Sequence, residues 1–196
     1  MEQFDLTFTP RKKFKETYRI RTNRLKHWDY TSEGMYFITI CTKGKVQWFG
    51  EIEDGKMFLS PVGKIAQQFF QDIPKHFSNA TVVDFIVMPN HIHGLIHIKD
   101  RSFVETCESR VSTNPIRGRP TLRSHSISSM MNQFKSVCTK HIRNLGHKDF
   151  HWQSRFHDRL IRSKAELQNV QKYIRENVAH WEEDSEFAHS VQPASV

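Results

Sequence analysis

Two histidines lie two residues apart inside an apolar stretch, DFIVMPNHIHGLIHI, at residues 84–98. Because side chains alternate between the faces of a strand, His91 and His93 project from one face about 7 Å apart, and Ile92 points into the core. Two imidazoles at this spacing can share one metal ion. His97 shares the face, but it lies about 13 Å beyond His93 and is too far away to join them. An isolated His-x-His is more often a polar pair on the solvated face of a sheet, so further ligands must decide.

The last predicted helix offers such groups. It has an apolar stripe at helical spacing, formed by Leu167, Val170, Ile174, Val178 and Trp181. Tyr173 and Asn177 are four residues apart along one edge of this stripe, so their polar groups point the same way. A tyrosine beside a core stripe more often packs than reacts. Here, however, Asn177 is a candidate third metal ligand and Tyr173 a candidate nucleophile.

This set of residues suits the cleavage of a phosphodiester. A phenol, with a pKa near 10, is a poor nucleophile at neutral pH, but a divalent cation on the scissile phosphate stabilises the charge of the transition state. Attack by tyrosine leaves a covalent phosphotyrosine. The energy of the broken bond is then kept for rejoining, and no nucleotide cofactor is expected.

The positive charge of the chain is concentrated near its start. The formal net charge is +8, and eight basic residues stand against one acidic residue, Glu16, in residues 11–26. This arm also carries Phe14, Tyr18 and Trp28 close by, and no apolar helical face accompanies it, so it favours single-stranded nucleic acid over a membrane. A solvated basic tail is the alternative. The predicted DNA-binding residues are Arg11, Lys12, Lys13, Lys15, Arg19, Arg21, Arg24 and Lys26, with Lys135 and Lys140 on a later helix.

The periodicity of the chain predicts an α+β fold with one mainly antiparallel sheet, flanking helices and a ferredoxin-like order. Strands are expected at 34–42, on both sides of the Asp54-Gly55 turn within 45–60, at 81–88, at 91–98 and at 159–163. Helices are expected from Pro61 to about residue 77, bent near Pro74, from residue 127 to Gly146, and after a Ser163/Glu166 capping box.

The chain divides into three predicted parts. Residues 1–33 form the DNA-contacting arm, residues 34–184 the catalytic domain with a mobile linker at 99–125, and residues 185–196 a tail. The chain lacks an apolar run of the roughly 20 residues that a bilayer span needs, and no signal-peptide pattern opens it, which predicts a soluble, cytoplasmic protein. Three widely spaced cysteines, Cys41, Cys107 and Cys138, are expected to be small buried side chains.

Several segments together resemble a known family. VMPNHIHGLI, FHDRLIRS and YIRENVAHW, with RTNRLKHWDYTSEGMYFITICT and FKSVCTKHI, look like REP-associated tyrosine transposases and the related single-tyrosine HUH transposases of small bacterial insertion sequences. The resemblance covers most of residues 19–184. It implies a ferredoxin-like palm with the HUH histidines on a central strand and a divalent metal, Mg²⁺ or Mn²⁺. It also implies cleavage of single-stranded or hairpin DNA through a 5′-phosphotyrosine.

The same resemblance assigns roles to individual residues. His91 and His93 match the HUH ligands, Tyr173 the nucleophile, and Asn177 the further ligand. Family members commonly carry Asn-Pro where this chain has Asn177-Val178, a difference that allows the helix to continue past Asn177. The insertion-sequence relatives resemble dimers with shared sites and the REP-associated ones can act alone, so both a monomer and a homodimer are compatible with the sequence.

The sequence is also compatible with other functions. Relaxases place the tyrosine before the histidines, but Tyr18 and Tyr30 lie in or next to the arm and Tyr36 opens a core-like strand. A metal-dependent nuclease that uses water as its nucleophile would not need Tyr173. A non-cleaving protein that binds hairpin DNA would need neither the tyrosine nor the metal.

The arm gives the first testable prediction. If residues 11–28 contact phosphates, deleting them should weaken DNA binding and flatten the slope of log affinity against log salt by roughly 0.7 per lost contact on single strands. The measurement is a salt titration of binding to a hairpin oligonucleotide. An unchanged slope would indicate that the arm is a solvated tail that does not contact DNA.

Overall fold

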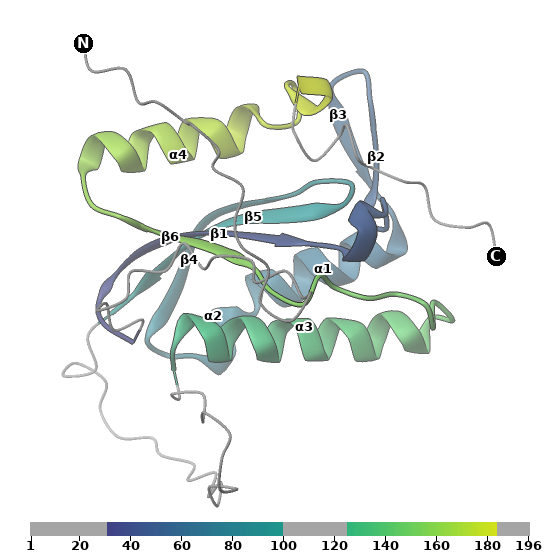
Figure 1. The fold of residues 1–196 in the computed structure, drawn as a ribbon, viewed down its shortest axis with the longest axis horizontal. Coiled ribbons are helices and arrows are strands. Elements are labelled where there is room, and N and C mark those ends of the chain that lie inside the picture. The colour runs from purple at the N-terminus through teal and green to yellow at the C-terminus, as the bar shows by residue number, and fades with distance from the viewer. Residues whose placement is uncertain (1–30, 100–124, 184–196) are drawn as a thin grey trace, which may run out of the picture.

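A four-stranded sheet with helices on both faces forms the body of the protein (Figure 1). The computed structural model describes residues 31–99 and 125–183, so the predicted arm up to residue 30, most of the linker and the tail lie outside the described residues. The elements are β1 (Gly34–Cys41), η1 (Lys43–Lys45), β2 (Gly50–Glu53), β3 (Lys56–Leu59), α1 (Pro61–Gln71), α2 (Ile73–His76), β4 (Ala80–Val87), β5 (His91–Ile98), α3 (Ile127–Asn144), β6 (His157–Ile161), α4 (Lys164–Glu176) and η3 (Trp181–Glu183).

The sheet has the order β4-β5-β1-β6, and every neighbouring pair is antiparallel. The chain crosses from β1 through α1 to β4, skipping a strand position that β5 then fills, and α3 carries it from β5 to β6 on the other side of β1. This is the split βαβ arrangement of ferredoxin-like folds. The predicted fold class is confirmed, and the histidine strand β5 is central because β4 and β1 flank it.

The two faces of the sheet differ in what covers them. On one face, alternate residues of β1 and β5, such as Ile38, Ile40 and Ile92, join α1 and α3 in the main core. On the other face, Leu95 and Ile161 pack with Ile174 of α4 in a smaller cluster. Figure 1 shows α4 on one side of the sheet and α1 and α3 on the other. The odd-numbered residues of β5 therefore face α4, and these include both histidines.

The predicted bend of the helix after Pro61 is confirmed, and the predicted last strand is shifted by two residues. The predicted helix after Pro61 is divided at Asp72, because Pro74 lacks an N–H and its ring crowds the carbonyl four residues earlier. The last strand spans His157–Ile161 instead of 159–163. It cannot reach residue 163, because Ser163 caps the next helix and accepts a hydrogen bond from the Glu166 N–H.

The end of α4 also answers a question from the sequence. The α-helix stops at Glu176, and Asn177 keeps helical backbone angles as its C-cap. The chain then turns, with the amides of Ala179 and His180 donating to the Glu176 carbonyl, and enters η3. Valine in place of proline after Asn177 therefore does not extend the α-helix.

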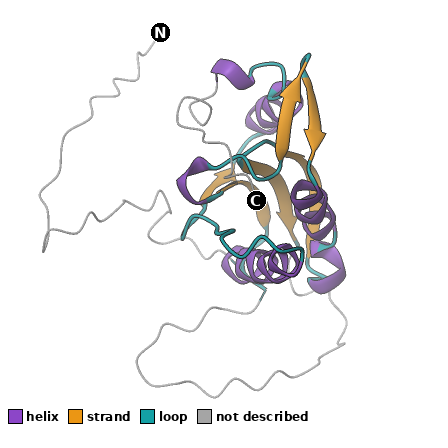
Figure 2. Cartoon of the chain, turned by 90° about the vertical axis from the view of Figure 1, so that its right-hand side faces the viewer, coloured by secondary structure: helices purple, strands orange, loops and turns teal. Residues whose placement is uncertain are grey.

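A separate hairpin of β2 and β3 projects from the body of the protein (Figure 2). Its turn residues Asp54 and Gly55 both have positive φ, 49° and 68°, as in the tight turns that match the twist of a hairpin. The hairpin lies beside the turn after α4, since Glu51 and Asp54 line the same hollow as Val178 and His180.

Gly94 gives a prediction about the core. A Cβ at this position would lie 2.3 Å from Cζ of Phe70. Phe70 is fully buried between Phe85 and Phe134, with ring centroids 5.2 and 5.3 Å away, so it has little room to move. Gly94→Ala should lower the free energy of unfolding by about 1–3 kcal/mol. Equilibrium urea unfolding measures this change.

The matched control for Gly94→Ala relieves the clash. Combining it with Phe70→Leu should cost less than the sum of the two single variants, because the smaller side chain makes room for the new methyl group. Strict additivity of the two costs would contradict the proposed contact.

Candidate active site

The two histidines of β5 converge on each other. Nε2 of His91 lies 2.9 Å from Nε2 of His93, and both side chains are buried. Their rings meet edge to face, with centroids 4.4 Å apart. Alternation along the strand placed them on one face, and the cover of α4 turns that face into an interior. The solvated polar pair that the sequence left open is therefore excluded.

Each imidazole has a polar partner on its other nitrogen. Nδ1 of His91 lies 2.8 Å from Oδ1 of Asn90, and the amide nitrogen of Asn90 donates to the Lys45 carbonyl at 3.2 Å. That second bond fixes the orientation of the Asn90 amide, so Nδ1 of His91 is assigned as the donor and its Nε2 carries a lone pair. Nδ1 of His93 lies 2.9 Å from the Thr39 hydroxyl, which can donate or accept.

The charge state of His91 follows from its surroundings. Burial, and after it the positive charge of Lys45, lowers the pKa of His91 to about 3. His91 is therefore neutral at physiological pH. A neutral imidazole is the form that binds a metal ion, so no proton has to leave His91 first.

Tyr173 of α4 reaches this pair. Its hydroxyl oxygen lies 3.1 Å from Nε2 of His93, although the residue is 44% exposed. Phe37 of β1 supports both rings: it stacks on His93 with centroids 5.3 Å apart and meets Tyr173 edge to face at 6.0 Å. Trp181 of η3 lies beside the His91 ring at 5.9 Å. The tyrosine is thus at the rim of the site, with the histidines beneath it.

Asn177 lies about one helical turn after Tyr173. It is buried, 3% exposed, and within the described part of the chain its Oδ1 has no hydrogen-bond partner. A buried carbonyl oxygen without a partner is costly unless something else occupies it. This supports Asn177 as a ligand, a role that stays a prediction.

The spacing of the two histidines fits a divalent ion. Two nitrogens bound to one ion at about 2.0–2.1 Å lie roughly 2.9–3.4 Å apart, and the two Nε2 atoms are 2.9 Å apart. Among residues 31–99 and 125–183, no group of three or more His, Cys, Asp or Glu side chains could hold a metal. An ion held by His91, His93 and the neutral Asn177 would therefore keep open positions for oxygen atoms of a substrate.

Other predicted residues lie away from this site. His97 pairs loosely with Glu33, at 3.8 Å, as expected for a residue that does not join the pair. Tyr36 is fully buried on the opposite face and donates to the Ser32 carbonyl, so it cannot replace Tyr173. Cys41 and Cys138 are buried thiols as predicted, and burial raises the pKa of Cys138, while Cys107 lies outside the described residues.

The basic residues are only partly placed. All eight from the arm, Arg11 to Lys26, lie outside the described residues. Lys140 is exposed on α3, and its contact with DNA stays a prediction. Lys135 makes hydrogen bonds within the protein: its Nζ donates to the carbonyls of Gln153 and Arg155 at 2.7 and 3.0 Å. Burial lowers the pKa of Lys135 to about 8.

Sequence reasoning missed three residues of the site. Asn90 directly precedes the histidine pair, so its position in the sequence was a usable signal. Thr39 and Phe37 were not recognisable, because they reach the site only through the pairing of β1 with β5, which sets Thr39 opposite His93.

The chain is similar in sequence to a bacterial protein. No protein-family model matches it. A Haemophilus influenzae protein, described only as uncharacterized, is 34% identical over 169 residues, which cover 84% of this chain and 91% of the relative. The chain belongs to the family of this Haemophilus protein.

The fold of this chain is similar to that of a solved structure. The chain is similar to a REP-associated tyrosine transposase bound to a REP hairpin, with a TM-score of 0.53 and 14% identity over 84% of this chain and 74% of that one. A Deinococcus radiodurans structure, at a TM-score of 0.44, is too distant to bear on the fold. At 14% identity this likeness shows a shared fold alone. No helix among the described residues is long and apolar enough to cross a membrane.

The contact between Tyr173 and His93 predicts how the site responds to metal. A metal ion and the tyrosine hydroxyl would compete for Nε2 of His93. Tyr173→Phe should therefore bind Mn²⁺ about two- to tenfold more tightly than the wild type without DNA, which is the worth of one neutral hydrogen bond. Calorimetric titration with MnCl₂ measures the affinity.

Two control variants accompany this measurement. Tyr36→Phe, which removes a hydroxyl on the other face, should leave Mn²⁺ affinity unchanged, and His93→Ala should abolish binding. Weaker Mn²⁺ binding by Tyr173→Phe would mean that the hydroxyl helps to hold the ion.

Proposed function

We propose that the protein is a metal-dependent enzyme that nicks and rejoins single-stranded DNA at hairpins through a 5′-phosphotyrosine on Tyr173. The observation that carries the proposal is the 3.1 Å contact between the Tyr173 hydroxyl and a buried pair of histidines whose Nε2 atoms are 2.9 Å apart. The likeness of the fold to a transposase bound to a REP hairpin supports the same substrate class.

The residues divide the work between holding and attacking. His91, His93 and Asn177 would hold Mg²⁺ or Mn²⁺, with Asn90 and Thr39 fixing the imidazoles. Bound there, the ion supplies a Lewis acid that neutralises charge on the scissile phosphate. Tyr173 stands at the edge of this position, exposed enough to meet a DNA strand that arrives from solvent.

The chemistry balances without a cofactor that carries energy. The Tyr173 oxygen forms a bond to phosphorus and loses its proton, while the bond from phosphorus to the 3′ oxygen breaks and that oxygen takes up a proton. The 5′ end stays on the protein until a 3′ hydroxyl attacks the phosphotyrosine. Because each step forms one phosphoester bond for each one that it breaks, rejoining needs no nucleoside triphosphate.

The arrangement also bears on assembly and location. His91, His93 and Tyr173 come together within one chain, which supports a protein that can act as a monomer. A substrate of cellular DNA would place its action in the bacterial cytoplasm, at the nucleoid.

Mapping of a covalent adduct tests the function. The protein is incubated with a labelled single-stranded hairpin oligonucleotide and Mn²⁺, then digested, and the labelled peptide is sequenced. A DNA adduct is expected on the peptide that contains Tyr173 and is absent in Tyr173→Phe, since phenylalanine has no nucleophile. The fold should survive, because the ring and its contacts remain.

Controls separate the alternatives. Tyr36→Phe should still form the adduct, and His93→Ala should bind the hairpin without cutting it. Cleavage without an adduct that persists in Tyr173→Phe would mean a nuclease that uses water. Hairpin binding with no cleavage in any variant would mean a non-cleaving DNA-binding protein.

A further inference from the structure

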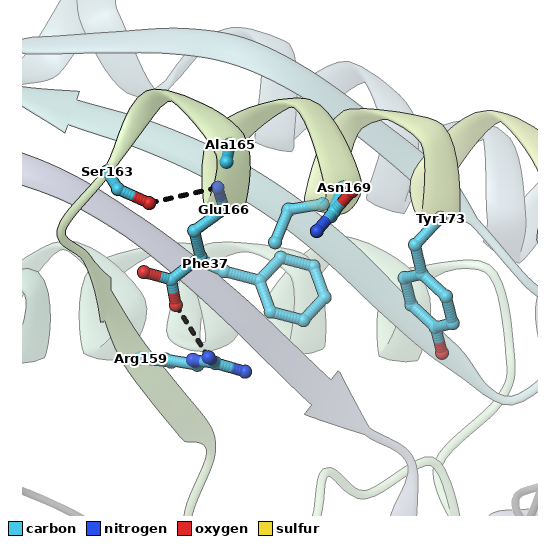
Figure 3. Close-up of a pocket in the computed structure, with 8 residues that line it drawn as sticks. Phe37, Arg159, Ser163, Ala165, Glu166, Asn169 and Tyr173 are labelled. Carbon is cyan, nitrogen blue, oxygen red and sulfur yellow. Dashed lines mark hydrogen bonds and ion pairs between the residues drawn. The ribbon is translucent and has the colours of Figure 1, made fainter. Parts of the chain in front are cut away.

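An open groove runs along α4 next to Tyr173. It has a volume of about 590 Å³, within the range of ligand-binding clefts. Its lining comes from three elements and is mixed aromatic and polar: Phe37, Arg159, Ser163, Ala165, Glu166, Asn169, Val170 and Tyr173. Tyr173 stands at one end of it and the start of α4 at the other, as Figure 3 shows. Phe37 and Tyr173 also belong to the histidine site, but the rest of the groove has no part in the metal-binding role proposed above.

Phe37 gives the groove a flat apolar surface. One side of its ring stacks on His93, with an interplanar angle of 24°, and the residue also lines the groove. Figure 3 shows the ring between Arg159 of β6 and the face of α4 that carries Asn169. A partly exposed aromatic ring fixed from behind is a stacking platform for an unpaired base.

Polar groups stand beside this ring in a fixed arrangement. Arg159 donates to Oε1 of Glu166 at 2.7 Å, and its side chain is otherwise 70% exposed. The other oxygen of Glu166 accepts from the Arg162 N–H at 2.9 Å, so the carboxylate itself is held in place. The guanidinium keeps further donors for a ligand. Asn169 adds an exposed amide on the neighbouring turn of α4.

We propose that this groove binds the single-stranded nucleotides next to the scissile phosphate, with one base stacked on Phe37 and a purine selected by Arg159 and Asn169. Both side chains suit purines: arginine pairs with O6 and N7 of guanine, and asparagine with N6 and N7 of adenine. A purine also has the larger surface for stacking. The inference rests on the proposed function, because it is Tyr173 that would bring DNA to this groove.

The length of the groove agrees with such a segment. Ser163 and Tyr173 are ten residues apart, which is about 15 Å along a helix. At the 3.4 Å spacing of stacked nucleotides this holds about four of them, and fewer when the strand is extended.

Binding without cleavage tests the groove apart from the chemistry. The full chain is titrated in EDTA with hairpin oligonucleotides in which each nucleotide of the single-stranded flank is replaced in turn by an abasic residue. One flank position should lose about five- to 150-fold in affinity when its base is removed. Phe37→Leu should weaken binding to intact DNA by a similar factor, yet have little effect on the DNA that is abasic at that position.

Arg159→Gln keeps the test decisive if Phe37→Leu folds poorly, since the Arg159 side chain is largely in solvent. Wild-type protein should select purines at the mapped position from a randomised flank, and Arg159→Gln with Asn169→Ala should lose that selection. Equal losses at every flank position, or unaltered selection in the double variant, would overturn the groove assignment even if the tyrosine adduct forms. Conversely, a mapped purine position without any adduct would support the groove and remove the nuclease.

Discussion

The site depends on two imidazole nitrogens held 2.9 Å apart inside the protein. At this distance the two nitrogens share a proton in a hydrogen bond, or they share a metal ion. Asn90 assigns the lone pair of His91 to Nε2, and burial keeps that ring neutral. The fold therefore holds Nε2 of His91 as an acceptor that faces His93, which is the arrangement that the proposed metal site requires. A metal ion held there, next to the exposed Tyr173, would suit the phosphodiester chemistry proposed above.

The sheet separates this chemistry from the packing that holds it in place. Even-numbered residues of β5 are buried against α1 and α3, and at Gly94 the missing side chain lets Phe70 press directly on the strand. Odd-numbered residues carry the histidines toward α4. The central strand is thus fixed from one face and from both edges, which leaves the other face free for polar side chains that would weaken a core.

The helix α4 closes the site without sealing it. Ile174 anchors the helix to the sheet, while Tyr173, its neighbour in sequence, is 44% exposed. The same helix begins at the Glu166–Arg159 ion pair and forms one wall of the open groove. A strand of DNA lying along α4 would meet polar groups first, then the Phe37 ring, and last the tyrosine. The proposed binding groove and the proposed nucleophile are thus neighbours along α4.

The sequence by itself determined the strand that carries the histidines, their common face, and the helix that carries Tyr173 and Asn177. These features follow from the spacing of apolar and polar residues along the chain, because that spacing sets the face of the strand or helix on which each residue lies. Only the tertiary structure decided that β1 lies beside β5, which brings Thr39 and Phe37 to the histidines, and that α4 covers that face. It also decided that the Lys135 amine points to the carbonyls of Gln153 and Arg155. The order of elements favours a fold class, but strand register and helix docking arise from contacts between residues far apart in the chain. Local residue spacing does not specify which of those residues meet.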